Sequence, residues 1–136
     1  MSDWNKKIIE EFRANKGKVG GQFEHTPLLL LHTKGAKSGL ERVNPLAYFV
    51  DNDRYVVIAS KGGADTDPDW YRNVLANPEV SVEVGTEQFT ATASAPSEPE
   101  RTDLYEKMEK INPGFTGYKQ KTSRVIPVVT LTRKSS

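Results

Sequence analysis

The stretch T-K-G-A-K-S-G-L-E-R-V-N-P-L, residues 33–46, decides how the rest of the chain is organised. It lies between two apolar runs, residues 28–31 and 47–50, so we expect a loop at the tip of two paired strands. Its glycines let backbone N–H groups turn outward, and Ser38 adds a hydroxyl donor. Its cations, which face a single glutamate, are Lys34, Lys37 and Arg42. The pattern predicts a cradle for a phosphate or carboxylate; the alternative is a solvated hairpin tip whose lysines only aid solubility.

The composition narrows the classes of function. The chain has no cysteine, which excludes thiolate catalysis, iron–sulfur ligation and disulfide scaffolding. Its histidines, His25 and His32, are seven residues apart and match no common metal motif, so we expect no metal site and a structural role for His32. With 19 basic and 18 acidic side chains, the net charge of +1 gives no reason to expect a nucleic-acid partner.

Hydropathy predicts a soluble protein. The longest purely apolar run is residues 28–31, far shorter than a membrane span, and the N-terminus lacks the apolar core of a signal peptide. We therefore expect a cytoplasmic location.

An amphipathic helix and a glycine-rich link are expected at residues 1–21, ahead of a single barrel domain at residues 22–133. Ser2 or Asp3 can cap this helix. Its apolar face carries Trp4, Ile8, Ile9 and Phe12. That face packs on the protein's own core in the simplest interpretation. A partner helix, or peripheral contact with the inner face of the membrane, is the alternative, because basic residues outnumber acidic ones five to three over residues 3–18.

The remaining chain predicts about six mostly antiparallel strands and, with the first helix, about three helices. The expected strands are residues 28–33, 43–50, 55–60, 80–84, 89–93 and 125–131, with Pro127 at an edge or a bulge. Asp67 and Pro68 should begin a helix that ends near 77, and Ser97 with Glu100 should form a capping box for another ending near 111. Residues 115–118 are expected to be irregular. Strand pairs without regular βα alternation favour an α+β, mainly β fold: a closed or split barrel rather than a doubly wound sheet.

A second glycine-bearing basic loop, S-K-G-G at residues 60–63, follows the third expected strand. W-Y-R-N at residues 70–73 then lies on a helix whose N-terminus favours anions. Two such loops suggest one elongated anionic ligand. Trp70 and Tyr71 either wall a planar ring or pack in the core. Ser38 and Ser60 have no evident base partner, so a cofactor is expected to supply the reactivity.

At these residues the chain resembles a known family. G-A-K-S-G-L-E-R-V-N-P-L at 35–46, A-S-K-G-G-A-D-T-D-P-D-W-Y-R-N at 59–73 and N-P at 77–78 closely resemble the deazaflavin (coenzyme F420)-dependent nitroreductase family of actinobacteria. The resemblance spans roughly residues 25–132. It implies a split β-barrel like that of the FMN-binding pyridoxamine-phosphate-oxidase group, coenzyme F420 as cofactor, and hydride transfer to quinone-like or nitro acceptors.

The resemblance also implies roles for individual residues. The cofactor-binding residues would be Ala36, Lys37, Ser38, Gly39, Leu40, Arg42, Asn44, Pro45, Ala59, Ser60, Lys61, Gly63, Trp70, Tyr71 and Asn73. Among them, Lys37, Ser38, Gly39 and Arg42 would hold the phosphate and acidic tail of the cofactor. Ser60 and Tyr118 would be catalytic and, with Phe115, would face the acceptor, where a hydroxyl polarises or protonates the reduced oxygen.

The chain departs from the family pattern on the acceptor side. Asn112 and Phe115 stand where some relatives have tyrosines, and Ala36 stands where relatives can have a basic residue. These departures leave cofactor binding as the expectation and put nitro-prodrug activation in doubt. An FMN-dependent enzyme of the same barrel type and a non-catalytic deazaflavin carrier remain as alternatives, and both monomer and dimer stay open.

Overall fold

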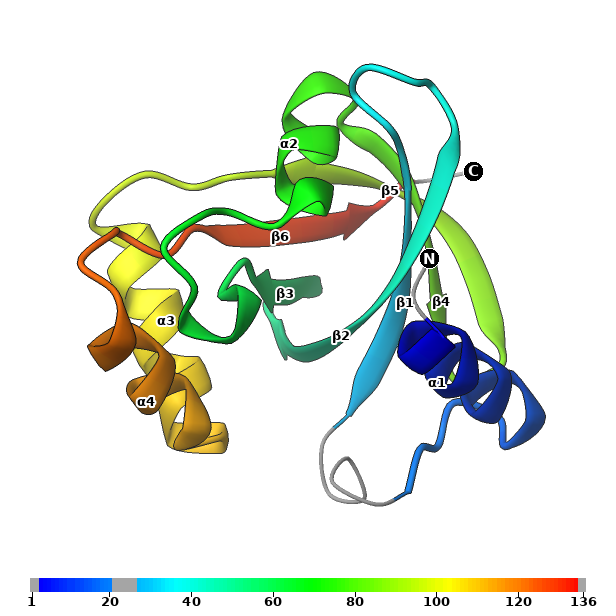
Figure 1. Ribbon diagram of the computed structural model, residues 1–136, viewed down its shortest axis with the longest axis horizontal. Helices are drawn as coiled ribbons and strands as arrows, with labels where there is room; N and C mark the ends of the chain where they lie inside the picture. The colour runs from blue at the N-terminus through cyan, green and yellow to red at the C-terminus, as the bar shows by residue number, and fades with distance from the viewer. Residues whose placement is uncertain (1–2, 21–26, 135–136) are drawn as a thin grey trace.

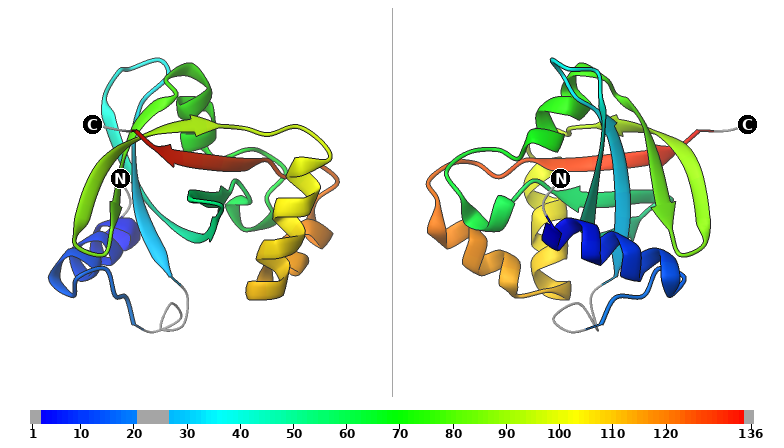
Figure 2. Two further views of the ribbon diagram at one scale, coloured as in Figure 1. Left: turned by 180° about the vertical axis from the view of Figure 1, so that it is seen from behind. Right: turned by 45° about the vertical axis from the view of Figure 1, so that its right-hand side comes forward.

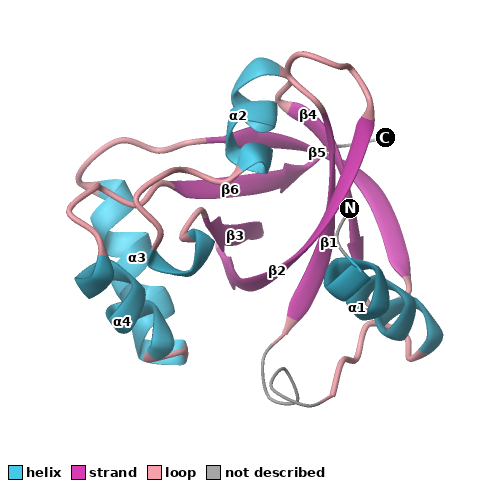
Figure 3. Cartoon of the chain, in the orientation of Figure 1, coloured by secondary structure: helices cyan, strands magenta, loops and turns pink. Residues whose placement is uncertain are grey.

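The computed structural model describes residues 3–20 and 27–134, and in this part of the chain six antiparallel strands close into a barrel in the order β1-β2-β3-β6-β5-β4 (Figure 1). The strands are β1 Leu28–Lys34, β2 Glu41–Asp51, β3 Arg54–Ile58, β4 Glu79–Val84, β5 Glu87–Ser94 and β6 Val128–Arg133. The helices are α1 Asp3–Ala14, the 3-10 turn η2 Lys61–Gly63, α2 Asp69–Ala76, α3 Glu100–Ile111 and α4 Gly114–Lys121 (Figure 3). The expected mainly β barrel is confirmed.

The four consecutive leucines of β1 show why this strand lies at the centre of the packing. Successive side chains of a strand point to opposite faces. Leu29 and Leu31 therefore fill the barrel, while Leu28 and Leu30 point outward against α1. A strand that is buried on both faces needs an uninterrupted apolar run.

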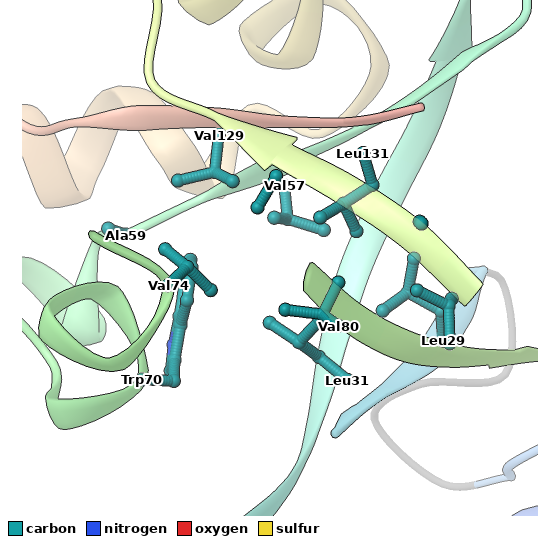
Figure 4. Close-up of a cluster of buried hydrophobic side chains, with 12 residues drawn as sticks. Leu29, Leu31, Val57, Ala59, Trp70, Val74, Val80, Val129 and Leu131 are labelled. Carbon is teal, nitrogen blue, oxygen red and sulfur yellow. The ribbon is translucent and has the colours of Figure 1, made fainter. Parts of the chain in front are cut away.

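Helix α2 covers one end of the barrel interior. Its Trp70 and Val74 project toward strand side chains such as Val80 and Val129 (Figure 4). The two helical side chains are therefore part of the same core as the strands, and the start of α2 is held rigidly against the barrel.

Helices α3 and α4 lie side by side on one flank of the barrel, and α1 lies on another (Figures 1 and 2). Leu104 and Met108 of α3 and Phe115 of α4 pack on the outward side chains of β3 and β6, such as Val56. This second core places α4 next to η2.

Helix α1 packs on the protein's own barrel, as the simplest interpretation of its sequence predicts. Ile9 and Phe12 are buried against Leu28 and Leu30, with Phe12 only 1% exposed. Arg13 donates two hydrogen bonds to the Glu83 carboxylate of β4, at 3.2 and 2.8 Å. No helix in the described ranges 3–20 and 27–134 is long and apolar enough to span a bilayer.

Four local expectations are wrong: the irregular segment, two helix caps and the position of Pro127. Residues 114–121 form a helix rather than an irregular segment, because burial of Phe115 outweighs the poor helix propensity of two glycines. Neither capping prediction holds. The N-cap of α2 is Pro68, and Asp67 instead pairs with Arg124. The N-cap of α3 is Pro99, and the Glu98 carboxylate accepts the Thr102 N–H. Pro127 precedes β6, where its carbonyl accepts the Ala59 N–H at 2.9 Å.

The boundary proposed at residues 21 and 22, like His25, falls outside the described residues, so the division into 1–21 and 22–133 stays a prediction.

Candidate active site

A cavity of about 1000 Å³ lies where the β1–β2 tip, the loop after β3, the start of α2 and helix α4 meet. The two basic loops, far apart in the chain, therefore line one cavity. The expected site residues on its wall are Ala36, Lys37, Ser38, Arg42, Asn44, Pro45, Ser60, Lys61, Trp70, Asn73, Phe115 and Tyr118. Expected residues outside the lining set are Gly39, Leu40, Ala59, Gly63 and Tyr71.

The first loop is tightly closed on itself. Gly35 N–H donates to the Leu40 carbonyl at 2.8 Å, and Gly39 N–H donates to the Gly35 carbonyl at 2.9 Å. The N–H groups of these two glycines are therefore used inside the loop and do not point to the cavity. Gly39, with a φ of 71°, is needed to close the turn, and the loop offers the cavity charged side chains.

Asn73 of α2 joins this loop to the barrel. Its Oδ1 accepts the Ala36 N–H at 3.0 Å, and its Nδ2 donates to Thr33 Oγ1 at 3.1 Å. Asn73 is 6% exposed and Thr33 is 2% exposed. Both ends of one buried amide thus hold the hairpin tip against the helix that carries Trp70.

Positive charge gathers around the cavity. Lys37 and Arg42 come from the first loop and strand β2, Lys61 comes from η2, and Arg72 comes from α2. Asp69, the acidic residue of the lining, forms an ion pair with Arg72 at 2.9 Å. The remaining cations leave a net positive field that favours an anionic ligand.

The second loop carries Ser60 and Lys61 to the cavity wall. Ser60 is 8% exposed, and Lys61 has a left-handed backbone with a φ of 48°, an uncommon conformation for a residue with a side chain. Ala59 is fully buried in the barrel core. Gly63 faces α4, where an added Cβ would lie 2.9 Å from the Tyr118 carbonyl. Ala59 and Gly63 therefore shape the loop from behind.

An apolar wall completes the cavity, and sequence reasoning missed most of it. Leu46, Ala47 and Ile58 line it beside Phe115. These side chains lie in strands that also build the core, so nothing in their pattern separates a cavity wall from ordinary packing. Trp70 serves both purposes: it is 5% exposed in the barrel core and also lines the cavity.

Tyr118 of helix α4 lines the cavity, and its ring packs against a neighbouring aromatic residue. Its ring packs edge-on against Phe115, with centroids 5.2 Å apart. The Phe115 carbonyl in turn accepts a hydrogen bond from the buried Tyr105 hydroxyl at 2.6 Å. Burial raises the pKa of Tyr105 to about 12, so this donor keeps its proton at any physiological pH.

The expected site residues that do not line the cavity lie elsewhere in the structure. Leu40 is 59% exposed, and Tyr71 packs against the barrel core, where burial and the nearby Asp67 charge raise its pKa. Gly39 lines a separate cleft of about 450 Å³ beside His32. His32 bonds the carboxylates of Glu41 and Glu83, which confirms its structural role.

Comparison with known proteins agrees with this geometry. The profile of the F420H(2)-dependent quinone reductase family matches residues 4–133. An F420H(2)-dependent quinone reductase of Mycobacterium tuberculosis is 41% identical over 127 residues, which cover 90% of this chain and 85% of that protein.

Solved structures give the same result. An F420-H2 dependent reductase superimposes with a TM-score of 0.71 at 40% identity and covers 77% of this chain and 93% of its own. A FAD-binding protein of Mesorhizobium loti, 14% identical with a TM-score of 0.55 and covering 99% of this chain and 91% of its own, shares the fold and so supports the split-barrel assignment. The fold, the family profile and the close relative converge: this chain belongs to the F420H(2)-dependent quinone reductase family.

Proposed function

We propose that this chain is an oxidoreductase that transfers a hydride from reduced coenzyme F420 to a quinone-like acceptor in the cytoplasm. The observation that carries the proposal is one cavity of about 1000 Å³ whose lining combines two basic loops with an apolar surface. A long anionic coenzyme with a planar ring and a flat apolar acceptor require these two surfaces side by side.

The residues of the cavity fit the coenzyme. Its phosphate and acidic tail match the cations Lys37 and Arg42, and its ring matches the side of the cavity formed by Trp70 and Ser60. When bound, reduced F420 supplies the hydride. The protein's contribution is to orient the ring against the acceptor and to exclude water, because hydride transfer depends on close, aligned approach.

The acceptor is proposed to lie against Leu46, Ile58 and Phe115, the apolar part of the cavity. Tyr118 and Ser60 then bring hydroxyl groups to its edge. A hydroxyl that donates to the acceptor's oxygen stabilises the negative charge that develops there and can transfer a proton to it. The polar edge and the apolar face together favour a quinone as acceptor. Asn112 and Phe115, which stand where some relatives have tyrosines, make a nitro compound a weaker candidate.

The test is titration of F420 fluorescence with Lys37→Ala and Arg42→Ala. Both side chains are exposed, so each substitution should weaken binding about five-fold, equivalent to about 1 kcal/mol. The matched control is Lys110→Ala, an exposed lysine of α3 outside the cavity lining, which should bind F420 like wild type. Unchanged affinity in both cavity variants would exclude the proposed tail site.

Two further measurements separate the alternatives. Titration with FMN distinguishes an FMN enzyme, for which the basic loop would meet a single phosphate, because that protein would bind FMN more tightly than F420. Stopped-flow oxidation of bound reduced F420 by menadione distinguishes a carrier, which would show no acceleration over free solution.

Peripheral membrane contact through α1 is also open to test. Ile9 and Phe12 are buried against the barrel, whereas Lys6 and Lys7 are exposed. Contact with the inner face of the membrane through this helix would therefore be electrostatic and would be lost at high salt. Sedimentation with anionic vesicles at low and high salt measures it.

A further inference from the structure

Arg124 lies behind the loop that carries Ser60 and Lys61, outside the residues that line the cavity. Four of its five N–H donors are used on this loop. Nε donates to the Ala64 carbonyl at 2.7 Å, and Nη1 donates to Asp67 Oδ1 at 2.8 Å. Nη2 donates to the carbonyls of Ala59 and Ser60, at 3.2 and 2.8 Å. One planar guanidinium thus fixes both ends of residues 59–67.

The loop has few bonds of its own. Within it, Lys61 Nζ donates to Thr66 Oγ1 at 3.2 Å. Two backbone bonds join the Gly63 N–H to the Ser60 carbonyl at 2.9 Å and the Ala64 N–H to the Lys61 carbonyl at 3.2 Å. These bonds form one 3-10 turn, in which Lys61 has a positive φ. A short turn with an unfavourable backbone conformation persists only when its surroundings hold it, and Arg124 supplies most of that support.

Arg124 also connects the loop to helix α4. It lies in the segment between α4 and β6, close after Tyr118. In the same segment the Thr122 hydroxyl donates to Asp65 Oδ1 at 2.9 Å and accepts the Arg124 N–H at 3.2 Å. The connection therefore sets the position of the loop, with Ser60, relative to the helix that carries Tyr118.

We propose that Arg124 is a positioning residue for hydride transfer: it fixes the separation between the ring-side loop at Ser60 and the acceptor-side helix at Tyr118. This inference rests on the proposed function. Because Lys37 and Arg42, which are proposed to hold the cofactor's tail, lie on other elements, loss of Arg124 should leave tail binding in place and should impair the transfer step more than cofactor binding. A displacement of the reacting groups by about 1 Å can slow such a step by as much as 100-fold.

The experiment compares Arg124→Lys and Arg124→Gln with Arg101→Lys. Lysine keeps the charge but has a single nitrogen, which cannot reach four separated acceptors. Arg101 is a matched control because it donates to the Ile126 carbonyl at 2.9 Å and pairs with Glu98, and neither of these partners lies in residues 59–67. All three variants should lose some thermal stability.

The first readout is kinetic. In single-turnover oxidation of bound reduced F420 by saturating menadione, both Arg124 variants should be slower by about 10-fold or more, with an F420 dissociation constant within about 3-fold of wild type. Arg101→Lys should keep the wild-type rate. The second readout is hydrogen exchange without cofactor: the Gly63 and Ala64 amides should exchange about 10-fold faster in the Arg124 variants, while the Gly39 amide in the other loop should not change.

Unchanged exchange at Gly63 and Ala64 would overturn the inference, whatever the rate. Faster exchange with a wild-type transfer rate would also overturn it, since Arg124 would then be only structural. If wild-type protein itself fails to bind F420 or to reduce menadione, the proposed function fails instead. The exchange measurement in the cofactor-free protein keeps these two failures distinguishable.

Discussion

Substitution of Asn73 by alanine tests how strongly α2 holds the hairpin tip. It removes the two hydrogen bonds to Ala36 N–H and Thr33 Oγ1, each of which contributes about 0.5–1.5 kcal/mol. Ala36 is exposed, so its N–H can bond to water. Thr33 is only 2% exposed, and a buried hydroxyl without a partner costs about 1–3 kcal/mol.

We therefore expect Asn73→Ala to lower the free energy of unfolding by about 2–3 kcal/mol and the Tm by roughly 8–12 °C. F420 should also bind about five-fold more weakly, because the freed loop must be ordered on binding. Urea unfolding, calorimetry and F420 titration measure the three quantities.

The control is Asn77→Ala at the end of the same helix. This substitution keeps the backbone N–H of residue 77, which donates to the Asn73 carbonyl, so the end of the helix is preserved. Thr33→Val, combined with Asn73→Ala, completes a double-mutant cycle that should give a coupling of about 1 kcal/mol. A loss of less than about 0.5 kcal/mol, together with F420 affinity equal to that of Asn77→Ala, would refute the reasoning.

Two predictions concern the attachment of the N-terminal helix. The hydrogen bond from Arg13, opposed in part by burial, lowers the pKa of Glu83 in the folded protein. The stability that this ion pair contributes is therefore present above the pKa of Glu83 in the unfolded chain, and it is lost as the pH falls through the pKa of Glu83 in the folded protein. The difference in unfolding free energy between wild type and Arg13→Ala should thus shrink between pH 7 and about pH 3; a constant difference would contradict this. Gly17→Ala, with a φ of 93° and a Cβ 2.6 Å from the Gly85 Cα, should cost more than about 1 kcal/mol. Gly20→Ala, whose Cβ meets nothing within 4 Å, is the control, and equal unfolding free energies for the two variants would be inconsistent with the close approach.

The barrel was predictable because its signals are local. The uninterrupted apolar run around Leu29 and the two-residue periodicity around Val80 indicate strands, and turn residues between neighbouring strands indicate antiparallel pairs. The paired loop motifs also carried the resemblance to the family that the comparisons bear out.

Helix caps and α4 were not predictable in the same way. The sequence around Ser97 and Asp67 offers several carboxylates and hydroxyls at equivalent spacings, and the choice between them depends on what lies opposite. Asp67 faces Arg124, which is distant in the chain, so it forms an ion pair instead of a cap. Helix α4 has two glycines and forms because Phe115 is buried against α3.

The sequence by itself determined the strand pattern, the two basic loops and their family resemblance, since each of these depends on neighbouring residues. Only the tertiary structure decided which residues surround the cavity. It includes the apolar wall around Ile58 and leaves Ala59 and Gly63 outside the lining. It also places Asn73 and Arg124 against backbone groups of distant segments, to which they form hydrogen bonds. The physical reason is that these hydrogen bonds and this cavity wall are contacts between segments far apart in the chain, and the local sequence pattern does not specify which distant segments will pack together.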